Sequence, residues 1–290
     1  MELLHTVEGM QAHADAARAA SQRLALVPTM GALHEGHLAL VEAARQRADH
    51  VTVSIFVNPT QFAPGEDYAQ YPRTLDSDLA ALESAGGVDA VFAPTPEAMY
   101  PFGLPPFTTV HVRDLNRYLC GAFREGHFEG VTTVVTKLFL ACRPHVAIFG
   151  EKDAQQLAIL RRMTAELGFG IEVIGHPIVR EADGLALSSR NRYLSAEERQ
   201  QAVVVSKALA EVHEAVAGGE RDPRALVDAM RHTVATAPLA ELQYAEVVDT
   251  ELLQPVETLT SGRYLAALAV FFGATRLIDN TTLDLEGSDY

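Results

Sequence analysis

Short apolar runs alternate with amphipathic stretches over the first two-thirds of the chain. Stretches with helical spacing of apolar residues lie at 36–49, 75–85 and 154–167. Between and around them are β-branched or apolar runs short enough to be buried strands, at 23–29, 50–58, 88–95, 145–150 and 171–179. Strands separated by helices of this length predict a parallel sheet with right-handed crossovers. The secondary structure of the segment 131–142 is ambiguous, because its β-branched residues favour a strand and its length favours a helix.

The pattern changes after about residue 180. Ser195 to Glu198 form a capping box at the head of a long helix that ends near Gly218 and Gly219. Asp222 and Pro223 fit the N-cap and first turn of another helix. The runs 242–249 and 262–280 read as strands of a small sheet, with Gly273 at a turn. We therefore expect an α/β domain over 1–179 and a smaller α+β domain over 180–290.

Composition narrows the class of protein. The chain has 290 residues and a formal net charge of −15, which argues against a general nucleic-acid binder, since that needs a basic face. Its two cysteines, Cys120 and Cys142, form neither a disulfide framework nor a zinc motif. The N-terminus lacks the features of a signal peptide, and no apolar run is long enough for a membrane span. These features predict a cytoplasmic protein that binds neither nucleic acid nor membrane.

Two histidines, His34 and His37, stand where a predicted strand gives way to a helix. Ligands of open parallel sheets bind at the carboxyl ends of strands, and a helix N-terminus there attracts anions. Imidazoles can donate hydrogen bonds to phosphate oxygens, and Gly36 lets the backbone approach a nucleotide. The pattern His-x-Gly-His is typical of nucleotidyl-transferring enzymes; the alternative is a helix cap with incidental surface histidines.

Two further stretches carry groups suited to phosphate. Lys152 and Asp153 follow the strand at 145–150, although a charged cap with a solvated lysine is the plainer reading of that stretch alone. Ser188 to Asn191 offer two hydroxyls and a guanidinium, which make a charge-assisted phosphate clamp or else a polar interdomain linker. Together with the histidine corner, they favour a nucleotide site over three unrelated surface features.

The sequence closely resembles the pantothenate synthetase family over nearly its whole length. The resemblance rests on "PTMGALHEGH" (28–37), "VSIFVNPTQF" (53–62), "DYAQYPRT" (67–74), "HFEGVTTVVTKLF" (127–139), "FGEKDAQQ" (149–156) and "VREADGLALSSRNRYLS" (179–195). It implies ATP-dependent condensation of pantoate with β-alanine through a pantoyl adenylate, with release of AMP and pyrophosphate. It also implies a Rossmann-like N-terminal domain, a smaller C-terminal lid and a homodimer.

The resemblance assigns site residues in three ATP-binding elements. Among these, His34, His37, Lys152 and Arg190 match the catalytic positions. Leu187 stands where the family usually has Met, a swap of similar volume. The residues matched to ATP binding are Met30, Gly31, Ala32, Leu33, His34, Glu35, Gly36, His37, Gly150, Glu151, Lys152, Asp153, Val179, Leu187, Ser188, Ser189 and Arg190.

Other matched positions concern the substrates. Gln61 and Gln156 match the amides that hold pantoate; without the resemblance, they are ordinary glutamines of a loop and a helix surface. Asn58 supports the amine site. The resemblance places Tyr71 and Arg73 in a loop that walls the site, and Arg124 and His127 near pantoate or the dimer interface.

We expect Mg²⁺ to be bound by the ATP phosphates, because this ion usually binds through phosphates and one or two carboxylates. Asp78 is the candidate protein ligand of this ion; the alternative is that Asp78 is an ordinary carboxylate on the surface of a helix.

The sequence is also compatible with two other functions. One is an adenylyltransferase that stops after nucleotide transfer and shares the histidine corner. The other is a non-catalytic nucleotide-sensing module. The paired glutamines and the second domain favour the ligase, and the basic and histidine side chains argue against a mere sensor.

Overall fold

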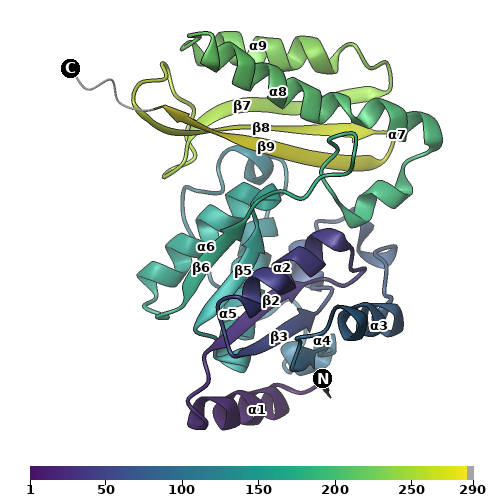
Figure 1. Ribbon diagram of the computed structural model, residues 1–290, viewed down its shortest axis with the longest axis vertical. Coiled ribbons are helices and arrows are strands. Elements are labelled where there is room, and N and C mark those ends of the chain that lie inside the picture. The colour runs from purple at the N-terminus through teal and green to yellow at the C-terminus, as the bar shows by residue number, and fades with distance from the viewer. Residues whose placement is uncertain (286–290) are drawn as a thin grey trace. The chain divides into compact units, whose positions relative to one another are not determined.

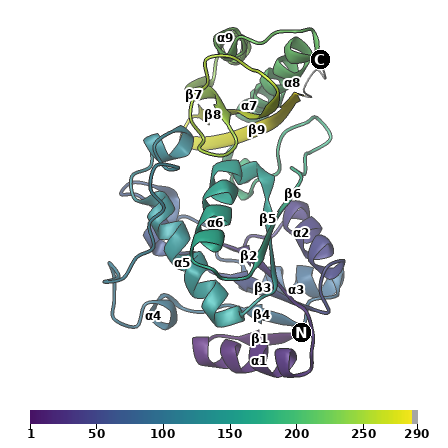
Figure 2. The same ribbon diagram turned by 90° about the vertical axis from the view of Figure 1, so that its left-hand side faces the viewer.

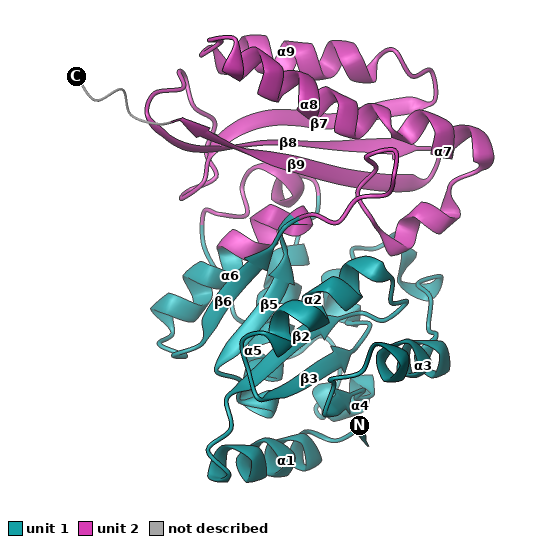
Figure 3. Cartoon of the chain, viewed as in Figure 1, with its two compact units in different colours: residues 1–113, 124–151, 159–177 teal, residues 114–123, 152–158, 178–290 magenta. Residues whose placement is uncertain are grey.

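The computed structural model describes residues 1–285. The chain forms two compact units (Figure 3). Unit 1 comprises 1–113, 124–151 and 159–177, and unit 2 comprises 114–123, 152–158 and 178–290, of which 286–290 lie outside the described residues. The predicted boundary at 179/180 falls close to the start of the last segment of unit 2. Two short segments of the predicted first domain, 114–123 and 152–158, instead group with unit 2 through long-range contacts.

Unit 1 contains a six-stranded parallel sheet, in the order β1-β4-β3-β2-β5-β6. Figure 1 labels β2, β3, β5 and β6 of this sheet, and Figure 2 labels all of its strands. Its pairs are all parallel, as the alternating pattern predicts. The strands are β1 (Glu2–Leu4), β2 (Leu24–Thr29), β3 (His50–Ile55), β4 (Ala90–Phe92), β5 (Val146–Gly150) and β6 (Glu172–His176). β2 lies between β3 and β5, so the strand order reverses there, and such a switch point is where open α/β sheets bind ligands.

Helices cover both faces of this sheet, which explains the nearly continuous apolar strands. α2 (Glu35–Arg45) and α3 (Leu75–Ala85) pack on one face, whereas α5 (His127–Cys142) and α6 (Ala154–Glu166) lie on the other (Figure 2). The ambiguous segment 131–142 is thus helical. α2 ends four residues before the predicted limit. Two further helices, α1 (Val7–Ala19) and α4 (Pro96–Met99), have no counterpart among the predicted elements.

Unit 2 is built on an antiparallel sheet of β7 (Ala240–Asp249), β8 (Gly262–Phe272) and β9 (Thr275–Leu285). Gly273 turns β8 into β9 with a φ of 55°. α8 (Val204–Ala217) and α9 (Pro223–Val234) bury their apolar faces in the same core as this sheet. The predicted long helix is in fact two, α7 (Ala196–Ala202) and α8, which meet at Val203. Three consecutive valines there weaken helix propensity.

Five 3₁₀ turns complete the described secondary structure: η1 (Pro59–Gln61), η2 (Asp67–Ala69), η3 (Leu119–Ala122), η4 (Glu151–Asp153) and η5 (Ser189–Tyr193). Four of them fall in segments that the sequence singles out for chemistry. In residues 1–285, no helix combines the length and the apolar character that crossing a membrane requires.

Candidate active site

The loop from β2 to α2 is held in an unusual backbone conformation. Gly31 has φ 80° and Ala32 has φ 51°, both in the left-handed region. A Cβ on Gly31 would lie 3.0 Å from an oxygen of Asp78, so glycine fits where the loop meets that carboxylate. His34 then caps α2 in an extended conformation, as the predicted strand-to-helix corner requires.

The two histidines of this corner are oriented by backbone donors. Nδ1 of His34 accepts from the N–H of Gly36 at 3.1 Å, and Nδ1 of His37 accepts from the N–H of His34 at 3.4 Å. Because a backbone N–H can only donate, each neutral ring carries its proton on Nε2. The ring centroids are 4.1 Å apart. Nε2 is therefore the donor nitrogen of each ring, and an imidazole N–H is a donor suited to phosphate oxygens.

Asp78 supports the same corner from α3. It is 2 % exposed, and its two oxygens accept from the N–H groups of Ala32 at 3.0 Å and Leu33 at 2.8 Å. Charge-assisted hydrogen bonds of this kind are stronger than neutral ones. Residues 1–285 contain no group of three or more His, Cys, Asp or Glu side chains able to hold a metal ion. Both oxygens of Asp78 thus accept from backbone N–H groups of the β2–α2 loop and hold that loop in place.

The predicted acid-binding glutamine lies against the histidine loop. Gln61 donates from Nε2 to Sδ of Met30 at 3.1 Å and accepts from Nδ2 of Asn58 at 3.1 Å. Asn58, 1 % exposed, also receives a hydrogen bond from the hydroxyl of Tyr100 at 2.7 Å. Unit 1 therefore brings together the predicted nucleotide corner and two predicted substrate residues, at the carboxyl ends of β2 and β3.

α5 contacts the loop that carries Asn58 and Gln61 at Gly130. The side chain of Asn58 donates to the carbonyl of Gly130 at 3.2 Å. A Cβ at Gly130 would lie only 2.3 Å from the carbonyl oxygen of Thr60. Glycine at this position lets the helix approach η1 and fixes the depth of the loop that carries Gln61.

Arg124 and His127 hold the backbone of that loop. Arg124 pairs with Glu66 through two contacts of 2.6 Å and reaches Nε2 of His127 at 2.9 Å. Nδ1 of His127 donates to the carbonyl of Gln61 at 2.7 Å. Burial raises the pKa of Glu66, but the hydrogen bond and charge of Arg124 outweigh it, so this pKa lies below its ordinary value. Both residues, predicted near pantoate or a dimer interface, thus position Gln61 through its main chain.

The loop predicted to wall the site is anchored at Tyr71, which is 5 % exposed and packs edge-on against Phe62 with a centroid separation of 5.9 Å. Arg73 donates to the carbonyls of Tyr68 and Tyr71, each at 3.2 Å.

The second predicted element begins at the carboxyl end of β5. β5 pairs with β2, the strand that leads into the histidine corner; Gly150 is the last residue of β5, and Glu151 follows it. Both residues belong to unit 1, at the switch point of its sheet.

Lys152, Asp153 and Gln156 belong to unit 2. The Lys152 side chain is 21 % exposed, and its Nζ lies 3.9 Å from the Asp153 carboxylate, a long separation for an ion pair. The carbonyl of Lys152 accepts from Nδ2 of Asn280 at 2.8 Å. Gln155, adjacent to the predicted Gln156, is buried and ties this segment to the carbonyls of 115 and 118.

The third element is a hairpin followed by η5. The N–H of Leu187 donates to the carbonyl of Val179 at 2.9 Å, which brings together two predicted ATP residues. Ser188 caps η5 by accepting from the N–H of Arg190 at 3.3 Å. In unit 2 the structure thus gathers Val179, Leu187, Ser188, Ser189 and Arg190 in one turn region.

Some residues of this arrangement escape sequence reasoning. Tyr100, Gly130, Asp279 and Asn280 act through contacts across 40 to 128 positions of the chain. Short local patterns cannot reveal such partners. The "RLIDN" run is a signal in the sequence, since a carboxylate and an amide directly follow the apolar pair Leu277 and Ile278 there.

Comparison with known proteins decides between the predicted functions. The sequence model of the family described as Pantoate-beta-alanine ligase matches residues 2–282. The chain belongs to this family. It is 61 % identical over 287 residues to the pantothenate synthetase of Salinibacter ruber, and the match covers 97 % of each chain.

Solved structures agree with the family assignment. The pantothenate synthetase of Thermus thermophilus superposes with a TM-score of 0.90 at 45 % identity, covering 97 % of this chain and 99 % of that one. A pantoate-beta-alanine ligase of Francisella tularensis, complexed with Beta-gamma ATP and Beta-alanine, gives a TM-score of 0.79 at 32 % identity, covering 97 % of both chains. This member of the pantoate-β-alanine ligase family is therefore a ligase with the Rossmann-like fold expected, and a transferase that stops at nucleotide transfer is not favoured.

Proposed function

We propose that this ligase condenses pantoate with β-alanine in two steps at the residues described above. A pantoate carboxylate oxygen attacks the α-phosphorus of ATP, and the bond to the bridging oxygen of pyrophosphate breaks. The β-alanine nitrogen then attacks the carbonyl carbon of the pantoyl adenylate, loses a proton and expels AMP. The observation that carries the proposal is the contact of Gln61 with Met30, which joins a residue matched to pantoate binding to a residue matched to ATP binding in a chain of this family.

Each residue has a role that its chemistry supports. The Nε2–H donors of His34 and His37 stabilise the phosphate charge that moves onto pyrophosphate. Lys152 neutralises charge at the α-phosphate, and Arg190 with the serines of the third element binds the outer phosphates. Electrostatic stabilisation of this kind needs no protein nucleophile.

The amides account for the organic substrates. Gln61 and Gln156 accept from hydroxyls of pantoate and donate to its carboxylate, and Asn58 orients the loop at the amine site. Mg²⁺ would be carried by the ATP phosphates, where it would neutralise negative charge, and the backbone-bonded carboxylate of Asp78 would hold the loop that receives the phosphates.

A reaction without β-alanine tests the proposal. ATP and pantoate alone should release pyrophosphate and yield a pantoyl adenylate detectable by mass spectrometry. Addition of β-alanine should then release AMP together with the amide. An enzyme that forms the adenylate and ignores β-alanine would refute the ligase assignment, and an enzyme that releases no pyrophosphate would refute adenylation itself.

We also propose a cytoplasmic homodimer, as the family resemblance implies. Phe102 and Phe107 of unit 1 are 88 % and 93 % exposed, and a second copy would cover such a surface. Sedimentation should give a dimer for the natural chain and a smaller species for Phe107→Asp; a monomeric natural chain would refute the proposal. Localisation is tested by fractionation of the producing cell.

A further inference from the structure

β9 is an edge strand of the sheet in unit 2, and it carries two adjacent polar residues, Asp279 and Asn280. Both are buried, at 2 % and 6 % exposure. Successive side chains of a strand point to opposite faces of the sheet. Thr281 meets His213 of α8, so Asp279 shares the helix-covered face. Arg276 meets Cys120, so Asn280 shares the face toward the segments 114–123 and 152–158.

On the first face, Asp279 holds the hairpin of the third nucleotide element. Its oxygens accept from the two terminal nitrogens of Arg180, at 2.6 Å and 3.0 Å. Its carboxylate also accepts from the N–H of Asn280 at 2.8 Å. A bidentate pair of this kind fixes direction as well as distance, so Arg180 and the neighbouring Val179 are tied to β9.

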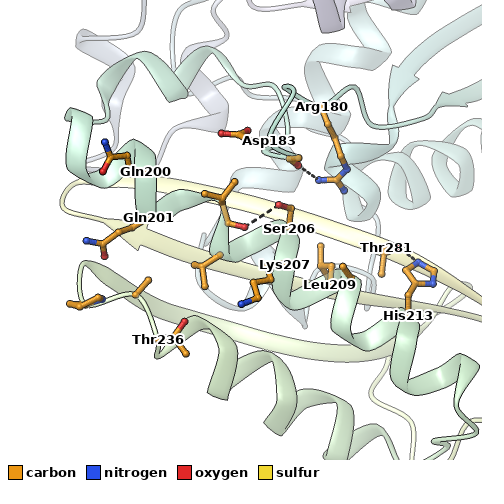
Figure 4. A pocket seen from close by; sticks show the side chains of 16 residues that line it. Arg180, Asp183, Gln200, Gln201, Ser206, Lys207, Leu209, His213, Thr236 and Thr281 are labelled. Carbon is orange, nitrogen blue, oxygen red and sulfur yellow. Dashed lines mark hydrogen bonds between the residues drawn. The ribbon is translucent and has the colours of Figure 1, made fainter.

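A cavity lies beside the ion pair of Arg180 and Asp279. Arg180 and Thr281 line it together with side chains of α8, and its volume is about 890 Å³ (Figure 4). Open space lies on the Arg180 side of the hairpin, whereas the Leu185 side chain of the same hairpin is 2 % exposed and belongs to the core of unit 2. Arg180 spans the hairpin by donating to the carbonyl of Gly184 at 3.0 Å, and its pair with Asp279 ties the hairpin to β9. The ion pairs of Arg199 with Glu181 and Asp183 hold the same hairpin to α7.

On the second face, Asn280 holds the segment of the predicted catalytic lysine. Its Nδ2 donates to the carbonyl of Lys152 at 2.8 Å. An amide can donate this hydrogen bond, whereas a carboxylate of the same size cannot. Position 280 thus sets the main-chain position from which the Lys152 side chain extends.

We propose that Asp279 and Asn280 are positioning residues for adenylation, which join the Lys152 element and the 179–190 element of unit 2 through one edge strand. The proposal rests on the nucleotide-binding roles assigned to these two elements above. Asn280 acts on turnover, because Lys152 stabilises charge in the transition state. Asp279 acts on ATP binding, because its partner belongs to the hairpin of the third element.

A double-mutant cycle tests the first half, with pantoate-dependent exchange of labelled pyrophosphate into ATP as the assay. Asn280→Leu should lower kcat roughly 10- to 100-fold with little change in the KM for ATP. In the Lys152→Ala background the same substitution should cost less than about 2-fold, because independent sites add and coupled ones do not. Thr282→Val, on the same strand, is the matched control and should keep normal kcat.

The outcomes separate this proposal from the function on which it depends. Equal losses from Asn280→Leu in both backgrounds would overturn the positioning role while leaving Lys152 catalytic. Unchanged exchange in Lys152→Ala would overturn the role of Lys152 and the positioning with it. If the leucine variant does not fold by circular dichroism, Asn280→Asp keeps the volume and removes the donor; normal kcat in that variant would overturn the proposal.

The second half has its own variant. Asp279→Asn should raise the KM for ATP about 5- to 10-fold and leave kcat within about 2-fold. A loss of kcat without a change in KM would overturn the assignment of Asp279 to the hairpin element.

Discussion

Gly130 offers a direct test of how α5 sets the substrate loop. Gly130→Ala would place a Cβ 2.3 Å from the Thr60 oxygen, 2.6 Å from its carbonyl carbon and 2.7 Å from the Cα of Gln61. All three atoms are backbone, so no flexible side chain can yield. Since ordinary contact begins at 3.4 Å, helix and loop must separate by about 1 Å.

The expected magnitude follows from that displacement. A shift of about 1 Å in groups that position a substrate costs about 100-fold in kcat/KM, or about 2.7 kcal/mol of transition-state stabilisation. The free energy of unfolding should change less, because overpacking costs roughly 1–3 kcal/mol while alanine favours a helix over glycine by about 1 kcal/mol. The loss should fall on pantoate and β-alanine, with the KM for ATP nearly unchanged.

Steady-state kinetics with each substrate varied in turn, together with urea unfolding, provide the measurement. Gly218→Ala is a matched control, because its φ is −75° and the nearest atom beyond its chain neighbours, the carbonyl oxygen of Ala215, would lie 3.3 Å from the added Cβ. A Gly130→Ala enzyme with normal kcat/KM would refute the reasoning that helix contact sets the depth of the Gln61 loop.

Three further predictions concern charge. Lys152→Ala should lower the rate of pyrophosphate release by about 100- to 1000-fold at an unchanged melting temperature, and normal release would contradict its electrostatic role. Asp78→Ala leaves two buried backbone N–H groups unsatisfied, so the free energy of unfolding measured with urea should fall by about 2–4 kcal/mol. Asp78→Asn keeps one acceptor and should lose less. Equal stability of both variants and the natural chain would refute this role. The pKa of Glu66 is lower in the folded state, so the unfolded state binds the proton more readily. The stabilisation from the pair of Glu66 with Arg124 is therefore present above pH 4.5 and is lost as the pH falls through the folded pKa. Glu66→Gln should therefore weaken the acid dependence of the unfolding free energy below that pH, and an unaltered profile would contradict the pairing.

Local pattern alone predicts much of this protein. Periodicity locates the central strands and α3, and capping residues locate the starts of α7 and α9, because caps and apolar faces act over one or two helical turns. The histidine corner and the Gly150 turn follow from strand ends, since parallel strands present their carboxyl ends at one edge of a sheet.

Only tertiary structure decides which distant groups meet. The segments 114–123 and 152–158 join unit 2 through hydrogen bonds to strands more than a hundred positions away. The carboxylate of Asp78, which sequence reasoning offers as a metal ligand, is turned toward two backbone N–H groups of another loop. Chain order carries no record of such pairings, because they depend on how the strands are ordered in each sheet and on which faces the helices cover.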